Sequence, residues 1–173
     1  MEKLEMKEHY DFLQQEFENV NGWLHFAEAK NAAMIAFNIA LFAAVLSSEY
    51  LWDYIWLFSL ILVGLLLSIY WGIISFWPIN KNIKKANKEV AENLLHFAYI
   101  ATLDGEEYIK KLYVNYWNVE EVDPTNIPQI EKDYSDEIVV NSRITLRKQR
   151  YFEYSIKTTV FALIICVLLI ICA

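Results

Sequence analysis

The sequence is poor in residues that interrupt helices, with only four glycines and three prolines in 173 residues. This scarcity disfavours a turn-rich β architecture and favours long, uninterrupted helices. Cysteine is also rare. Cys166 and Cys172 are the two present, and their spacing directs them to different sides of a helix. An intrachain disulfide between them is therefore not expected.

Motifs of enzymes and metal sites are missing as well. The sequence contains no glycine-rich phosphate loop and no nucleophile elbow. The three histidines, His9, His25 and His96, stand alone without a neighbouring cysteine or a second histidine at ligand spacing. We therefore predict that the protein is not an enzyme and holds no cofactor or metal ion.

Positive charge is in deficit, since the formal net charge is −7. Binding to a nucleic-acid polymer needs a basic surface, so that class of partner is not expected. Apolar residues are in excess: hydrophobic residues make up 56% and aromatic residues 16% of the chain. A soluble domain of this size cannot bury so much apolar surface, which points to a lipid bilayer as the partner.

Three stretches without charge carry this excess. The clearest runs from Tyr54 to Trp77 and ends before Pro78, and it exceeds the roughly 20 residues that span a bilayer. We place the other spans at about 31–48 and at 154–173, where Lys157 extends its ammonium toward the headgroups. The predicted fold is an all-α membrane protein. Its parts are an N-terminal amphipathic helix (1–30), a transmembrane hairpin (31–77), a cytoplasmic helical region (78–153) and a third transmembrane helix.

The distribution of basic residues predicts the orientation. The segment Ser47–Asp53 between the first two spans has no lysine or arginine, whereas the other segments hold all fifteen. The positive-inside rule then places the N-terminus and region 78–153 in the cytoplasm and the C-terminus outside. The acidic first 30 residues do not resemble a cleaved signal peptide.

The predicted cytoplasmic segments show helical spacing of apolar residues. We expect one helix from Leu4 that enters the first span and packs against region 78–153. Further helices are predicted from Ile83 to Ala101 and over 106–117, followed by a loop over 119–128 that contains two prolines. A last helix from Ile130 continues into the third span.

Small residues recur every four positions in two spans. Ala36 and Ala40 belong to such a series in the first span, and Gly64, Ser68 and Gly72 form one in the second. Faces of this kind let helices approach closely, either within one subunit or between subunits of a homo-oligomer.

Asn38 lies inside the first span, seven residues after Asn31. An amide in hydrocarbon needs a partner, so Asn38 is predicted to link helices within one subunit, to link subunits, or to line a polar path.

Two basic clusters flank the predicted spans. Attraction to anionic headgroups explains both of them. Alternatively, Arg143, Arg147 and Arg150 share one helical face and suit a phosphate ligand, with nearby aromatic rings to stack on a base. The clusters comprise Lys81, Lys84, Lys85 and Lys88 after the second span, and Arg143, Arg147, Lys148 and Arg150 before the third.

Three segments of the sequence are distinctive: FAEAKNAAMIAFN at 26–38, NLLHFAYI at 93–100 followed by Leu103 and Glu107-Tyr108, and the stretch 129–147 before the last span. In these segments the chain resembles the transmembrane effectors of Pycsar-type bacterial antiphage systems. The order of two spans, cytoplasmic helices and a third span is similar too.

The resemblance implies a membrane effector of the bacterial inner membrane. A cyclic nucleotide from a partner cyclase, expected to be a cyclic pyrimidine mononucleotide, would trigger oligomerisation and membrane impairment, with growth arrest or abortive infection. The alternative is a non-pore scaffold or accessory subunit that docks a cytoplasmic partner. The candidate ligand-binding residues are Lys30, Asn31, His96, Tyr99, Arg143, Arg147 and Arg150. The candidates for membrane assembly or a pore are Asn38, Ala36, Ala40, Gly64, Ser68 and Gly72.

Overall fold

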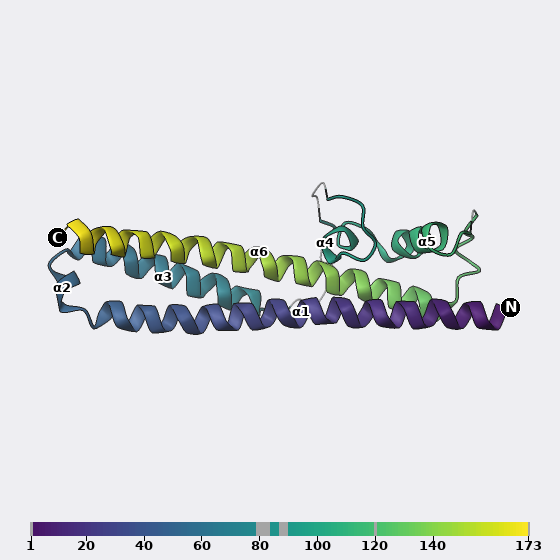
Figure 1. Cartoon of the computed structure of the whole chain (residues 1–173), viewed down its shortest axis with the longest axis horizontal. Coiled ribbons are helices and arrows are strands. Elements are labelled where there is room, and N and C mark those ends of the chain that lie inside the picture. The colour runs from purple at the N-terminus through teal and green to yellow at the C-terminus, as the bar shows by residue number, and fades with distance from the viewer. Residues whose placement is uncertain (1, 79–83, 87–89, 120, 173) are drawn as a thin grey trace. The chain divides into compact units, whose positions relative to one another are not determined.

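The computed structural model describes residues 2–78, 84–86, 90–119 and 121–172, and these residues contain helices and connecting segments but no strand. Figure 1 shows the elements, which are α1 (Glu2–Leu46), α2 (Glu49–Trp52), α3 (Ile55–Ser75), α4 (Phe97–Ile100), α5 (Gly105–Asn115) and α6 (Gln129–Cys172). Helices α1, α3 and α6 are long and apolar enough to cross a membrane. The predicted all-α class with three spans is confirmed.

The chain forms two compact units. We call residues 1–25 and 79–146 the head unit, and residues 26–78 and 147–173 the membrane unit. Helices α1 and α6 each contribute their first part to the head unit and their second part to the membrane unit. The predicted unbroken helices from the N-terminus into the first span and from residue 130 into the third are thus confirmed.

The head unit is held by a hydrophobic core drawn from all its helices. Leu13 and Val20 of α1 are buried against Ile100, Ile109 and other apolar side chains of α4, α5 and α6, which confirms the packing predicted for the N-terminal helix.

Aromatic and polar contacts reinforce this core. The His9 ring stacks on Trp117 with centroids 3.7 Å apart. The buried Glu131 of α6 accepts a hydrogen bond from the Tyr113 hydroxyl at 2.8 Å and lies 3.6 Å from His9 Nδ1. One carboxylate therefore joins α1, α5 and α6.

The helix predicted from Ile83 to Ala101 is wrong in its described part. Residues 84–86 and 90–93 are not helical, and only the single turn of α4 forms. Side chains compete with the helical hydrogen bonds here: Asn93 Oδ1 accepts from Leu95 N, and His96 Nδ1 accepts from Ala98 N. Ile83, Lys81 and Lys88 lie outside the described residues. The other predicted elements, the helix α5 and the loop after it, are confirmed.

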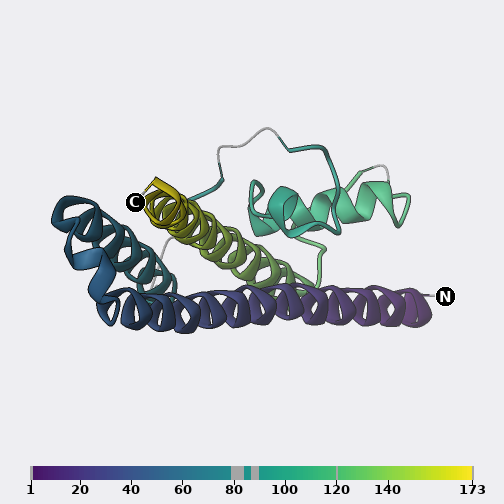
Figure 2. The ribbon, with the colours of Figure 1, turned by 60° about the vertical axis from the view of Figure 1, so that its left-hand side comes forward.

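The membrane unit contains three long helical segments, with α3 antiparallel to α1 and α6, and the short α2 between α1 and α3. Figures 1 and 2 both show α1 and α3 close together at the C-terminal end of α3 and farther apart toward α2. The buried positions recur every seven residues on each helix, as in coiled-coil packing. They form three layers, namely Asn31, Ser75 and Lys148; Asn38, Ser68 and Ser155; and Val45, Ile61 and Ala162.

Two glycines of the head unit predict opposite effects of an added methyl group. At Gly105, a Cβ would lie 1.8 Å from Asp136 Oδ1 and 3.0 Å from Asp136 Cα, whereas at Gly22 nothing lies within 4 Å. Gly105→Ala should destabilise the head unit by about 1–3 kcal/mol because α6 must move away. Gly22→Ala should stabilise it by about 0.5–1 kcal/mol because alanine favours a helix interior. Chemical denaturation of both variants in detergent checks the pair. Equal effects would contradict the close packing of α5 on α6.

Candidate functional site: a polar network between the spans

The most unusual feature of the membrane unit is a group of four polar side chains in its core. Asn38 of α1, Ser68 of α3, and Ser155 and Thr159 of α6 are all at most 2% exposed. Three separate helices therefore direct polar groups to one point between apolar spans.

Hydrogen bonds close this polar network. Asn38 Nδ2 donates to Ser68 Oγ at 2.9 Å and to Met34 O at 2.8 Å, while Thr159 Oγ1 donates to Asn38 Oδ1 at 2.7 Å. Ser68 Oγ lies 2.7 Å from both Ser155 Oγ and Thr159 Oγ1. Ser155 Oγ also donates to Ser68 O at 3.1 Å. Both ends of the Asn38 amide are thus satisfied within one chain.

The sequence indicated Asn38 and Ser68 but missed Ser155 and Thr159. Serine and threonine cost little in a span because each can bond to its own helix, so their presence alone is a weak signal. Their spacing of one helical turn on the third span is the only hint in the sequence. The structure shows that Asn38 links helices within the subunit, and its predicted role in assembly or a pore remains a prediction.

A second polar layer lies seven residues from the first. Lys148 of α6 is only 8% exposed, and its ammonium donates to Ser75 O at 3.0 Å and lies 3.2 Å from Glu28 Oε1. Asn31 Nδ2 donates to Ala27 O and to Lys148 O. The lysine therefore ties α1, α3 and α6 together and does not join the other basic side chains at the surface.

Small residues have different surroundings on the two helices that carry them. A Cβ at Gly64 would lie 3.1 Å from Ala162 Cβ, and one at Gly72 would lie 2.5 Å from Ile35 Cγ1. The small face of α3 thus packs inside the subunit. Ala36 and Ala40 of α1 are exposed, so this subunit does not use them for internal packing.

The candidate ligand-binding residues are divided between the two units. In the membrane unit, Lys30 lies over the rings of Phe26 and Phe152, at 4.8 Å from each centroid. Arg147 lies over the Tyr151 ring at 5.2 Å. Arg150 is exposed, while Asn31 is fully buried in the second polar layer.

The other three candidates belong to the head unit. His96 caps the N-terminus of α4. The Tyr99 hydroxyl donates to Glu92 Oε1 at 3.0 Å. Arg143 donates to the carbonyl oxygens of Ala101 and Leu103 and so holds the chain after α4. These hydrogen bonds within the head unit account for the position of each side chain. A ligand that bound to these side chains would have to replace the hydrogen bonds.

The head unit also contains a polar pocket of about 510 Å³ that the sequence did not reveal. Asp104 caps α5 by accepting from Glu107 N at 2.9 Å, and Lys85 lies 2.6 Å from its carboxylate. The hydrogen bond from Lys85 lowers the pKa of Asp104 below its usual value, so this carboxylate stays charged. The lining consists of Asp104, Gly105, Glu106, Ile109, Pro124, Ile127, Gln129, Lys132, Ser135 and Asp136.

Comparison with known proteins gives one match over almost the whole chain. A family model described as the Pycsar effector protein domain matches residues 12–173. The chain belongs to this family. No similar protein was found among curated proteins or solved structures.

Membership makes the protein an antiphage effector that acts on a cyclic-nucleotide signal. With its three apolar helices, it is a protein of the inner membrane, and the family is not a known catalytic one.

The network predicts a specific effect of removing one hydroxyl group. Thr159→Val leaves Asn38 Oδ1 without its donor and should destabilise the membrane unit by about 1–2 kcal/mol. Thr158→Val is the matched control, because that hydroxyl bonds only to carbonyl oxygens of its own helix, Tyr154 O and Ser155 O. Unfolding in mixed micelles measures both. If Thr159→Val were as stable as the control, the network would not join the helices.

Proposed function

We propose that a cyclic pyrimidine mononucleotide causes this effector to oligomerise and impair the inner membrane, which arrests growth or aborts the infection. The N-terminus and the head unit face the cytoplasm in this proposal, and the C-terminus faces outward. One observation carries it: α1 and α6 each bear part of the head-unit core and part of the polar network.

Helix continuity provides the physical coupling. Val20 and Asn38 lie on α1, and Val139 and Thr159 lie on α6, so each helix joins a buried core residue to a network residue without a break. A ligand that moves α1 against α6 in the head unit biases the helices at the network as well. Packed helices respond to such a bias by changing between discrete arrangements.

The network is suited to such a change. Its hydrogen bonds at 2.7–2.9 Å depend on the register of three helices, so a small rotation of α6 separates Thr159 from Asn38. The hydroxyl of Thr159 can still bond to Ser155 O, but Asn38 Oδ1 would lose its donor, which is costly in hydrocarbon. This oxygen can recover a donor from another subunit or from water, and either outcome favours an assembled, leaky state over the resting one.

The alanine face of α1 supports assembly. Ala36 and Ala40 are exposed on the subunit, and small residues at this spacing allow close packing with a second helix. The other small face, on α3, is already occupied within the subunit. We therefore assign the contact between subunits to α1.

The polar pocket of the head unit supports a place for the nucleotide. Its volume of about 510 Å³ lies in the range of roughly 300–1,000 Å³ that is common for small-molecule sites. Lys132 supplies a cation for the cyclic phosphate, and Asp136 supplies an acceptor for a ribose hydroxyl or an exocyclic amine. The arginine face that includes Arg147 and Arg150 is the competing location.

A potential-sensitive dye in vesicles that contain the full chain tests the effector activity. Addition of cytidine or uridine 3′,5′-cyclic monophosphate should abolish the potential. Vesicles that contain the double variant Ala36→Leu/Ala40→Leu should keep their membrane potential, because larger side chains on α1 prevent close packing between subunits. Val160→Leu, which adds bulk to an exposed position of α6, is the control and should behave like the natural protein. A nucleotide that binds without any change in potential would contradict the proposal and favour a non-pore scaffold.

Calorimetric titration with the same nucleotides tests whether the nucleotide binds in the polar pocket of the head unit. Lys132→Ala should weaken binding by about tenfold to a hundredfold, since a charge-assisted contact is lost. Lys7→Ala, at an exposed position of α1, should not change it. If Arg147→Ala abolished binding while Lys132→Ala did not, the arginine face would be the site. Arg143→Ala is unsuitable here because that side chain holds backbone carbonyls.

A further inference from the structure

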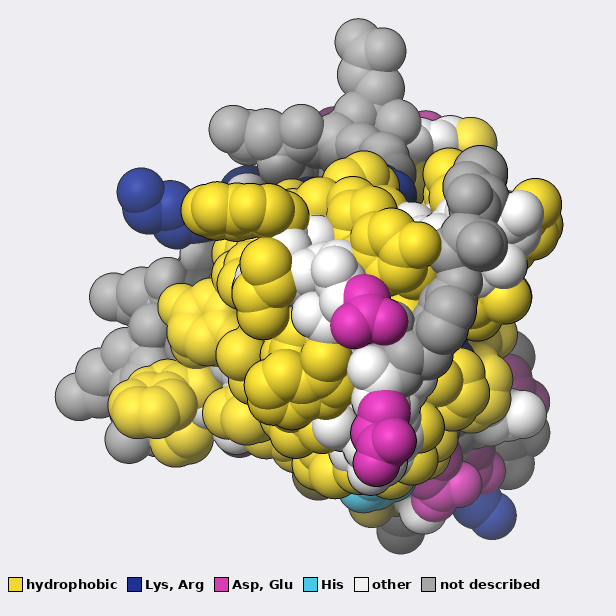
Figure 3. All heavy atoms as spheres, turned by 90° about the vertical axis from the view of Figure 1, so that its left-hand side faces the viewer, with side chains coloured by type: hydrophobic (Ala, Val, Ile, Leu, Met, Phe, Trp, Pro, Cys, Tyr) yellow, Lys and Arg dark blue, Asp and Glu magenta, His cyan; other side chains and the backbone are white. Residues whose placement is uncertain are grey.

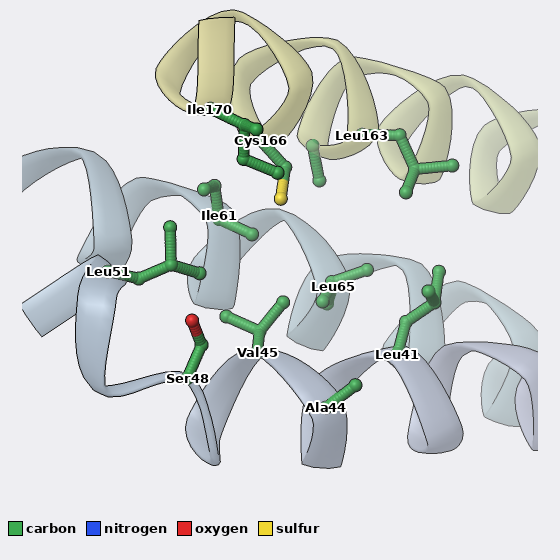
Figure 4. A pocket seen from close by; sticks show the side chains of 11 residues that line it. Leu41, Ala44, Val45, Ser48, Leu51, Ile61, Leu65, Leu163, Cys166 and Ile170 are labelled. Carbon is green, nitrogen blue, oxygen red and sulfur yellow. The ribbon is translucent and has the colours of Figure 1, made fainter. Parts of the chain in front are cut away.

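Besides the polar pocket of the head unit, the protein has an apolar pocket in the membrane unit. This apolar pocket has no part in the function proposed above. It has a volume of about 360 Å³ and lies among α1, α2, α3 and α6 (Figure 4). The residues that line it are Leu41, Ala44, Val45, Ser48, Leu51, Ile61, Leu65, Ala162, Leu163, Cys166 and Ile170. Leu51 of α2 is buried at one end, and the Cys166 sulfur points from α6 toward α3.

The packing of the helices explains why space remains here. Gly64 of α3 approaches Ala162 of α6 so closely that a Cβ on the glycine would lie 3.1 Å from the alanine methyl. Ala162 must therefore stay small, and it leaves its layer with Val45 and Ile61 underfilled. Beyond this crossing, α1 and α3 diverge toward α2, as Figures 1 and 2 show. The pocket opens where the three helices can no longer fill the space between them.

The chemistry of the lining selects one class of ligand. Among the described residues that line the pocket, none carries a charge, and only Ser48 and Cys166 have side chains other than hydrocarbon. A nucleotide or a sugar would lose its hydrogen bonds to water in such a pocket. An aliphatic chain would lose none and would fill space that otherwise lacks contacts.

The pocket lies where aliphatic chains are abundant, because lipid surrounds it. It lies between helices long and apolar enough to span the bilayer, where the surrounding solvent is acyl chains. Its lining runs along α1 from Leu41 to Val45, about 6 Å at the rise of an α-helix, and continues past the end of α1 to Ser48. Figure 3 looks onto the α2 end of this unit, where hydrophobic side chains gather over the centre of the described surface. We propose that the pocket binds one acyl chain of a bilayer phospholipid, inserted between α1 and α3.

Photocrosslinking tests this site in vesicles of phosphatidylethanolamine and phosphatidylglycerol that carry a diazirine in one acyl chain. With the full chain, mass spectrometry should locate crosslinks at pocket residues of α1, α3 and α6 in excess of those at the exposed faces of the same helices. Cys166→Phe should abolish this excess because the ring occupies the pocket.

Val167→Phe is the matched control, since Val167 is the next residue on α6 and is 52% exposed. It should keep the pocket crosslinks. Crosslinks spread evenly over all exposed apolar residues, or an equal loss in both variants, would overturn the proposal. An oxidative Cys166–Cys166 dimer in place of the lipid crosslinks would also overturn it and would identify a second copy as the occupant.

Discussion

The structure of the membrane unit depends on the hydrogen bonds that one buried side-chain amide, that of Asn38, requires. In hydrocarbon no water is present to bond to Asn38, and leaving its two polar atoms unpaired is costly. Asn38 Nδ2 donates one hydrogen bond to Met34 O of its own helix, but its second donor and Oδ1 find their partners in Ser68 and Thr159 of two other helices. This requirement fixes the height and rotation of α1, α3 and α6 against one another. Apolar packing alone would not do so, since leucine packs as well against lipid as against leucine.

Close helix packing makes those hydrogen bonds possible. Hydroxyl groups have short reach, so the helix backbones must approach, and they do so where Gly64 lies against Ala162 and Gly72 lies against Ile35. The same register brings Lys148 to Ser75 one heptad away in one direction. In the other direction it leaves the Ala162 layer underfilled. The second polar layer and the apolar pocket are thus consequences of the arrangement that satisfies Asn38.

The head unit is stabilised mainly by the hydrophobic effect and not by a network of hydrogen bonds. Its core contains Tyr108, Leu112 and other large side chains excluded from water, so hydrophobic burial drives its assembly. A ligand can alter such a core by adding a few contacts, whereas the network in the membrane unit changes only if helix register changes. In the function we propose, the continuous helices convert a modest binding event in the head unit into a discrete change in the bilayer. This combination suits an effector that must stay silent until a cyclic nucleotide appears.

The sequence by itself determined the spans, the continuity of α1 and α6, and the family, because these follow from charge-free length, from the scarcity of helix breakers and from local motifs. It misjudged the segment before α4, where the side chains of Asn93 and His96 compete with the helix through bonds that periodicity does not reveal. It indicated Asn38 as a polar group in need of partners, yet it could not identify Ser155 and Thr159 among many similar residues. Tertiary structure decided those partners, the burial of Lys148 and both pockets. The physical reason is that hydrogen bonds and cavities between helices depend on register and rotation, which no single helix encodes.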